Sequence, residues 1–170
     1  MTCCLAAKYD GGVVVASDSL LSLGDTKIFK PQLKMHNYGD LACLYAGTLH
    51  TIDHVFSEEP SRLLGIPLTD LQQLQRRCWD MKKELTKNPS DFLVVDEVGD
   101  IHILSGYGDL VSGFEFACVG SEFGWVGLDL VMDPTLRMTA NAVKLRLLKV
   151  LRAVARRDAS VSAPFFTEVL

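Results

Sequence analysis

The chain has 170 residues, 48% hydrophobic and 22% charged, with a formal net charge of −4 at pH 7. This length allows one sizeable core and is short for two, so we expect a single domain spanning 1–170. The negative charge argues against a nucleic-acid partner, which usually meets a basic surface. No apolar run approaches the roughly 20 residues of a membrane helix, so we expect no membrane partner.

The sequence contains five cysteines: Cys3, Cys4, Cys43, Cys78 and Cys118. Their number is odd and they lack C-x-x-C spacing, which favours buried thiols over disulfides or zinc ligands. Residues 3–7 are too short for the apolar part of a secretory signal, and charged residues follow at once. We therefore expect a protein of the reducing cytoplasm.

The chain opens with a predicted β-hairpin. Residues 2–8 and 12–18 are rich in Val, Ala and Cys, and the Asp-Gly-Gly turn at 10–12 joins them. Three consecutive valines at 13–15 predict a strand that is covered on both faces. Residues 19–33 show no clear period and are interpreted as an excursion.

A second hairpin is predicted over 34–47, with a buried strand at 41–46, and a short helix over 48–57. A longer helix follows, in which Thr69 and Gln72 fit a capping box. Its apolar residues recur at helical spacing: Leu68, Leu71, Leu74, Cys78, Met81 and Leu85.

The second half of the chain predicts a hairpin over 91–106, a strand over 113–120, helices over 122–132 and 139–157, and a final strand over 164–170. Hairpins and helices are segregated along the chain. This order indicates an α+β protein in which helices lie outside two stacked, mainly antiparallel sheets.

Common catalytic motifs are absent from the sequence: it has no G-x-S-x-G, no Walker loop, no G-x-G-x-x-G and no H-E-x-x-H. His50 and His54 share a helical face, which fits either two ligands of a metal site or an ordinary surface helix. No metal is predicted.

The N-terminus itself suggests a chemistry. A threonine hydroxyl is a poor nucleophile without a base within hydrogen-bond reach. If Met1 is removed, Thr2 carries both the hydroxyl and a free α-amine, whose ordinary pKa lies near 8. One residue then supplies the nucleophile and the base, as in the threonine variants of the catalytic triad. An immediate strand would hold such a residue in place.

On these residues the chain resembles the proteasome β-type subunits, and among them the bacterial HslV type and the Anbu branch. These are N-terminal-nucleophile hydrolases, and the resemblance runs over nearly all of the chain. It implies a four-layer αββα sandwich, a threonine-type endopeptidase activity, and no cofactor. It also implies homo-oligomeric stacked rings that take peptides or unfolded proteins, with an ATP-dependent unfoldase as a possible partner.

The resemblance assigns roles to individual positions. Thr2 falls at the nucleophile, Asp18 at the acidic residue that orients a lysine, and Lys34 at that lysine, whose ammonium would lower the pKa values of the Thr2 hydroxyl and amine. Gly47 falls at the glycine whose N–H forms the oxyanion hole. The remaining matches are Ser121, which would bind the α-amine, and Asp158, which would support it.

One position departs from the family pattern. A second serine is often found three residues after the aspartate, where this chain has Val161. Ser160 and Ser162 flank it, and either is a possible replacement. The resemblance further places Leu21, Tyr45 and Leu49 around an apolar substrate pocket.

Two other functions remain open at this stage. If Met1 is retained, the chain is a catalytically silent ring subunit. If the chain does not assemble into rings, it is an N-terminal-nucleophile amidase that acts on small amides. Two residue sets fit either a docking face or ordinary helix packing. They are Lys144, Arg146, Lys149, Arg152, Arg156 and Arg157, and Phe123, Trp125, Leu128 and Leu130.

Overall fold

The computed structural model describes residues 2–23, 26–29, 33–57, 69–81, 90–133 and 136–170. Its first sheet has four strands in the spatial order β10 (Phe116–Gly120), β1 (Cys3–Tyr9), β2 (Gly12–Asp18) and β11 (Phe165–Val169). The N-terminal hairpin and the final strand are confirmed. The valines at 13–15 are at most 1% exposed, so β2 is covered on both faces as predicted.

The second sheet has five antiparallel strands, β5 (Met35–Tyr38), β6 (Leu41–Ala46), β7 (Asp91–Val95), β8 (Ile101–Leu104) and β9 (Leu110–Phe114). The hairpins predicted over 34–47 and 91–106 are both present. The prediction of a single strand over 113–120 is wrong. This segment belongs to two strands, β9 and β10, which lie in different sheets, because the chain crosses between the sheets at Glu115.

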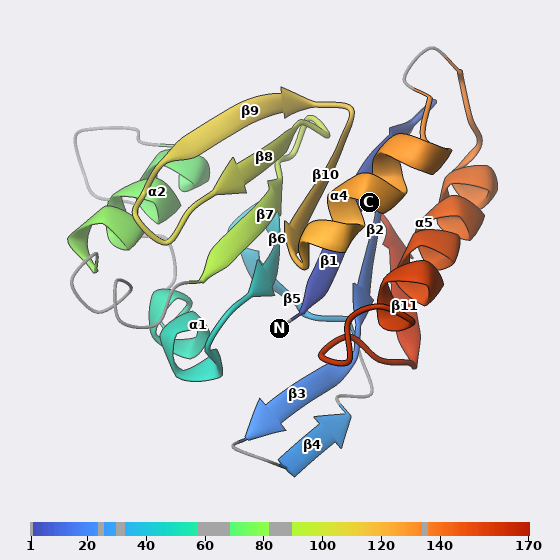
Figure 1. The fold of residues 1–170 in the computed structure, drawn as a ribbon. Helices are drawn as coiled ribbons and strands as arrows, with labels where there is room; N and C mark the ends of the chain where they lie inside the picture. Colours follow the sequence, from blue (N-terminus) through green and yellow to red (C-terminus); the bar gives the residue numbers. More distant parts are fainter. Residues whose placement is uncertain (1, 24–25, 30–32, 58–68, 82–89, 134–135) are drawn as a thin grey trace.

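Within the predicted excursion at 19–33, most of the described residues have regular structure. They contain a two-stranded hairpin of β3 (Leu20–Leu23) and β4 (Thr26–Phe29). The two strands pair with each other and with neither large sheet, and they project from the end of the sandwich (Figure 1). A hairpin without a large sheet beside it needs no regular apolar alternation, which explains why the sequence signal was weak.

Four helices are described: α1 (Leu49–Val55), α2 (Asp70–Asp80), α4 (Glu122–Val131) and α5 (Ala140–Ala155). The capping box of α2 is formed as predicted, with reciprocal bonds between Thr69 and Gln72. α1 and α2 cover the five-stranded sheet, and α4 and α5 cover the four-stranded sheet (Figure 1). None of the described helices is long and apolar enough to cross a membrane.

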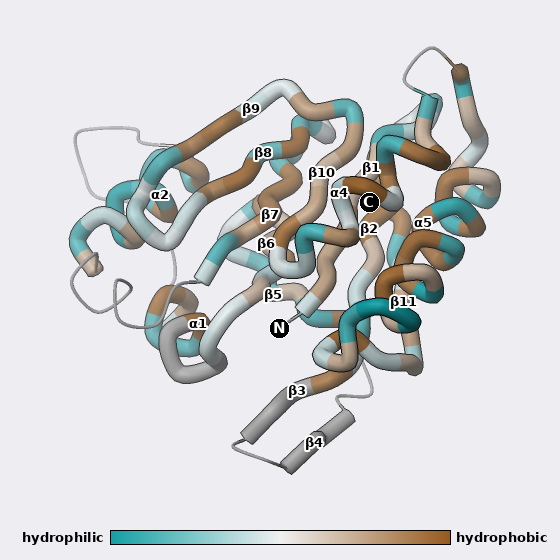
Figure 2. Tube along the Cα trace, viewed as in Figure 1, coloured by the Kyte–Doolittle hydropathy of each residue, from teal (hydrophilic) through white to brown (hydrophobic). Residues whose placement is uncertain are grey.

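Three hydrophobic clusters separate these layers. One lies between α4, α5 and the four-stranded sheet, a second between the five-stranded sheet and α1 and α2, and a third between the two sheets. Figure 2 shows hydrophobic residues along both sheets and alternating with hydrophilic residues along α5. The predicted α+β class and its αββα layering are confirmed.

The two residue sets that fitted either docking or packing are divided by the structure. Leu128 is fully buried against the sheet, and Phe123 and Trp125 pack on the same cluster, whereas Leu130 is 80% exposed. On α5, Arg146 donates a hydrogen bond to the Val131 carbonyl of α4, so part of the basic set serves helix packing.

Candidate active site

Thr2 lies immediately before β1 and is 8% exposed. The Ser121 backbone N–H donates a hydrogen bond of 2.8 Å to the Thr2 carbonyl oxygen. Gly120, the residue before that serine, has φ +95°, and a Cβ there would overlap the Thr2 carbonyl oxygen. The close approach of β1 and β10 therefore needs glycine at this point, and it holds the backbone of Thr2 in place.

Lys34 contacts the Thr2 hydroxyl directly. Its Nζ lies 2.8 Å from Thr2 Oγ1, 3.0 Å from Asp18 Oδ1 and 2.6 Å from the Leu20 carbonyl oxygen. These three oxygens match the three donors of an ammonium group. The lysine side chain is fully buried, so its charge is directed to the hydroxyl and the carboxylate and is screened little by solvent.

Asp18, the last residue of β2, connects this cation to the backbone of the N-terminus. Its Oδ1 accepts from the Cys3 N–H at 3.0 Å, and its Oδ2 accepts from the Leu20 N–H at 3.1 Å. The carboxylate is fully buried. It therefore neutralises Lys34 and fixes the residue next to Thr2 by hydrogen bonds that orient both groups.

Gly47 lies between β6 and α1, in an exposed turn with φ +150°. A Cβ at this position would overlap buried Ser90, whose hydroxyl accepts from the Thr48 N–H at 3.3 Å. Ala46, the preceding residue, lies beside Gly120. The structure therefore places Gly47 at the same end of the sandwich as Thr2.

Ser121 and Asp158 form a hydrogen-bonded pair next to Thr2, because Ser121 also bonds the Thr2 carbonyl. Ser121 occupies the N-cap position of α4 but makes no side-chain cap bond; its hydroxyl donates instead to Asp158 Oδ2 at 2.8 Å. Burial works to raise the pKa of Asp158, but hydrogen bonds from Ser160 and Ser121 outweigh it and hold this pKa below its ordinary value.

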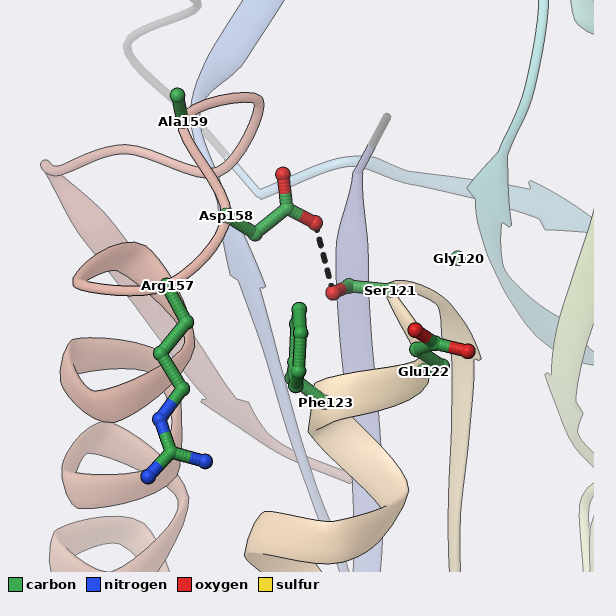
Figure 3. A pocket seen from close by; sticks show the side chains of 7 residues that line it. All are labelled: Gly120, Ser121, Glu122, Phe123, Arg157, Asp158 and Ala159. Atoms are coloured by element: carbon green, nitrogen blue, oxygen red, sulfur yellow. Dashed lines mark hydrogen bonds between the residues drawn. The ribbon is translucent and has the colours of Figure 1, made fainter.

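A cavity of about 390 Å³ adjoins this pair (Figure 3). Its lining residues are Gly120, Ser121, Glu122, Phe123, Arg157, Asp158 and Ala159. In Figure 3 the Phe123 ring stands between the Ser121–Asp158 bond and the guanidinium of Arg157. The cavity thus combines a carboxylate, an aromatic face and a cation beside the residue that holds Thr2.

The predicted substrate pocket needs a correction at Tyr45. Its side chain is only 2% exposed and belongs to the cluster beneath α1 and α2, where its ring lies 5.6 Å from that of His36. Alternation along β6 directs it away from the space between the sheets, so it presents little surface to a substrate. The side chains of Leu21 and Leu49 lie outside the described residues.

Some residues of the site were not predicted or were left undecided. Ser17 accepts the Lys34 backbone N–H at 3.0 Å, and the Leu20 carbonyl accepts from its ammonium. Ser160 bonds Asp158 through both its N–H and its hydroxyl, whereas Val161 packs in the core. Of the two serines beside the mismatch, Ser160 is therefore the one in the network. The sequence signal that could have identified Ser160 is its position two residues after Asp158, within reach of that carboxylate.

Among the described residues, no group of three or more His, Cys, Asp and Glu side chains is placed to hold a metal ion. The side chain of His50 lies outside those residues, so neither interpretation of the His50–His54 pair is tested. The described thiols are all free and buried.

Comparison with solved structures relates this arrangement to known proteins. The matches include a Gly-1 mutant of Anbu from Hyphomicrobium sp. strain MC1, with a TM-score of 0.78 and 17% identity, over 100% of this chain and 81% of that one. The chain has the fold of Anbu and HslV. Anbu from Yersinia bercovieri, described as an ancestral beta-subunit, aligns with TM-score 0.77 and 17% identity over 99% of this chain and 81% of that one. Eukaryotic HslV from Trypanosoma brucei aligns with TM-score 0.71 and 16% identity over 99% of both chains.

Comparison of the sequence with protein-family models and with curated proteins found no match. At this identity the structural likeness shows the fold, and the chemistry of the site rests on the residues described above.

Proposed function

We propose that this chain is a threonine-type peptidase subunit whose nucleophile is Thr2 after removal of Met1. The observation that carries the proposal is the 2.8 Å hydrogen bond between Lys34 Nζ and Thr2 Oγ1, with Lys34 itself held by buried Asp18. A buried cation beside a hydroxyl stabilises the alkoxide form of that hydroxyl. A threonine with only a structural role has no need of a buried ammonium.

In the proposed reaction, Thr2 Oγ1 attacks a peptide carbonyl carbon while the α-amine of the same residue takes the hydroxyl proton. The C–N bond then breaks, the amine returns the proton to the leaving nitrogen, and water hydrolyses the remaining ester. A general base of this kind contributes ~10²–10⁴ in rate. None of these steps calls for a metal or an organic cofactor.

The other residues have supporting roles in this proposal. The Gly47 N–H donates to the developing oxyanion, an interaction typically worth ~10²–10³ in rate. Ser121 and Asp158 orient the free amine, with Ser160 on the far side of the carboxylate. The cavity beside them gives the leaving segment of the peptide a place next to the amine that protonates it.

We further propose that the subunit works inside homo-oligomeric, stacked rings in the cytoplasm and takes unfolded chains, with or without an ATP-dependent unfoldase. Support comes from the fold shared with Anbu and HslV and from the description of one Anbu as a beta-subunit. The amidase alternative is favoured if the native mass corresponds to a monomer or a dimer, because such a species cannot enclose a protease site.

Two measurements test the peptidase proposal. The intact mass of the protein purified from cells should lack Met1, and a threonine-directed peptide inhibitor should add one adduct at Thr2. Thr2→Ala should abolish the adduct, and Thr2→Ser, which keeps a hydroxyl, should retain it at a lower rate. If cells retain Met1 and no adduct forms, the chain is a silent subunit and the proposal fails.

A further inference from the structure

A second polar cluster, separate from the residues around Thr2, joins β8, the edge strand β9 and the residue that follows β7. His102 Nδ1 is 2.7 Å from Ser112 Oγ, and His102 Nε2 is 3.1 Å from Asp96 Oδ2. The side chains of His102 and Asp96 are only 8% and 20% exposed, whereas Ser112 is exposed. The serine is thus open to solvent while the two groups behind it are shielded.

The partners of His102 decide which ring nitrogen carries the proton. A carboxylate oxygen can only accept a hydrogen bond, so Nε2 donates to Asp96. In a neutral ring this leaves Nδ1 as the acceptor, and the Ser112 hydroxyl donates to it. Asp96 is itself held, because its Oδ1 accepts from the backbone N–H groups of Val98 and Asp100. The chain of bonds therefore ends on a hydroxyl poised to lose its proton to a base.

A β-bulge creates this arrangement. Ile101 pairs with Phe114 and His102 pairs with Ser112, so Gly113 is an extra residue on β9. The bulge allows Phe114 to pack between the two sheets while Ser112 faces the histidine. Gly113 has φ +88°, and a Cβ there would meet nothing within 4 Å. No atom thus crowds the outer side of the bulge at Gly113, and Ser112 beside it is itself exposed.

We propose that Ser112 is a second nucleophile of this chain, one that accepts small acyl groups from activated esters. Its Oγ attacks the ester carbonyl carbon, the Oγ–C bond forms, and the bond from carbon to the leaving oxygen breaks. The hydroxyl proton passes to His102 Nδ1 and from there to the leaving oxygen. Asp96 acts as a positioning residue that keeps the proton on Nε2. A nucleophile, a base and a group that orients the base, all within hydrogen-bond reach, define an activated serine.

The test uses p-nitrophenyl acetate on the full-length Thr2→Ala protein, so that any acetylation is independent of the threonine site. Peptide mass mapping should place one acetyl group on Ser112 and none on Ser57, an exposed serine whose hydroxyl donates to the His54 carbonyl and accepts from the Arg77 guanidinium, neither of which is a base. His102→Gln should slow Ser112 acetylation about 100-fold, the scale of a lost general base. Acetylation of Ser57 and Ser112 at equal rates would overturn the proposal, as would an unchanged rate in His102→Gln.

Asp96→Asn provides a second variant in case His102→Gln fails to fold. It should leave the melting temperature nearly unchanged, slow acetylation of Ser112, and remove the preference for the Nε2–H tautomer in the ¹⁵N NMR spectrum of the His102 ring. A purely structural aspartate would change stability and leave the acetylation rate constant of the folded protein unaltered. That result would refute the positioning role.

Discussion

Replacing Lys34 by methionine tests whether the buried cation is required both for the fold and for the nucleophile. The substitution keeps much of the side-chain volume but removes an ammonium that bonds three oxygens, and it leaves the Asp18 carboxylate fully buried without its counter-ion. Removing one partner of a buried ion pair typically costs about 3–5 kcal/mol. With a urea m-value of about 2 kcal/mol/M, the unfolding midpoint should fall by about 1.5–2.5 M.

Two further variants separate charge from packing. Lys8→Met breaks a 2.8 Å pair with Asp100 in which the side chains are 28% and 52% exposed, so it should lower the unfolding midpoint far less than Lys34→Met does. The double variant Lys34→Met with Asp18→Asn removes both buried charges and should regain at least half of the stability lost in Lys34→Met.

The assay is urea unfolding, followed by the rate of inhibitor labelling at Thr2 under native conditions. The double variant should recover stability but not labelling, because no cation then faces the hydroxyl. The reasoning is refuted if Lys34→Met and Lys8→Met are equally stable, or if the double variant is no more stable than Lys34→Met. It is also refuted for the nucleophile if Lys34→Met labels at the wild-type rate.

Three further outcomes follow from the described contacts. Gly120→Ala should lower the free energy of unfolding in urea by about 2–5 kcal/mol, because the new Cβ meets both an unfavourable positive φ and the Thr2 carbonyl oxygen. Gly99→Ala, at φ +82° but with room for a Cβ, should lower it by only about 1–2 kcal/mol. Equal losses in the two variants would contradict the close approach of β1 and β10 at Gly120. Hydrogen bonds hold the pKa of Asp158 below its ordinary value in the folded chain, so its stabilisation is present above the ordinary carboxyl pKa and is lost as pH falls through the lower folded pKa. The melting-temperature deficit of Asp158→Asn should therefore be largest at about pH 6 and shrink steadily as pH is lowered below about 4. A deficit independent of pH would refute this. Burial raises the pKa of Cys78 to about 12, so iodoacetamide should modify this thiol at pH 8 only in denaturant, and modification of the native protein would contradict its burial.

The elements that were predicted from the sequence share strong local signals. The Asp-Gly-Gly turn at 10–12 and the turn near 97–99 locate hairpins because few residues adopt the backbone angles that tight turns require. The Thr69–Gln72 box locates the start of α2 because both of its bonds lie within one helical turn. These features depend on neighbours in the chain and can be predicted without any tertiary contact.

The elements that were missed depend on distant contacts. The sequence over 113–120 predicts one continuous strand, but the chain breaks at Glu115 between β9 and β10. The break arises because the chain passes there from one sheet to the other, which no local sequence pattern requires. Tyr45 lies in the apolar run of β6, in which successive side chains face opposite sides of the sheet. The sequence does not show which of the two faces is covered by helices, so it could not show that Tyr45 is turned away from a substrate.

The candidate site shows the same division. The sequence by itself placed a threonine next to Met1 at the start of a strand, and the family resemblance selected Asp18, Lys34, Gly47, Ser121 and Asp158. Only the tertiary structure decided that Lys34 reaches both the Thr2 hydroxyl and Asp18. It also selected Ser160 as the second partner of Asp158. A hydrogen bond requires two atoms within about 3 Å of each other, and for residues far apart in the chain that distance is set by strand register and sheet packing.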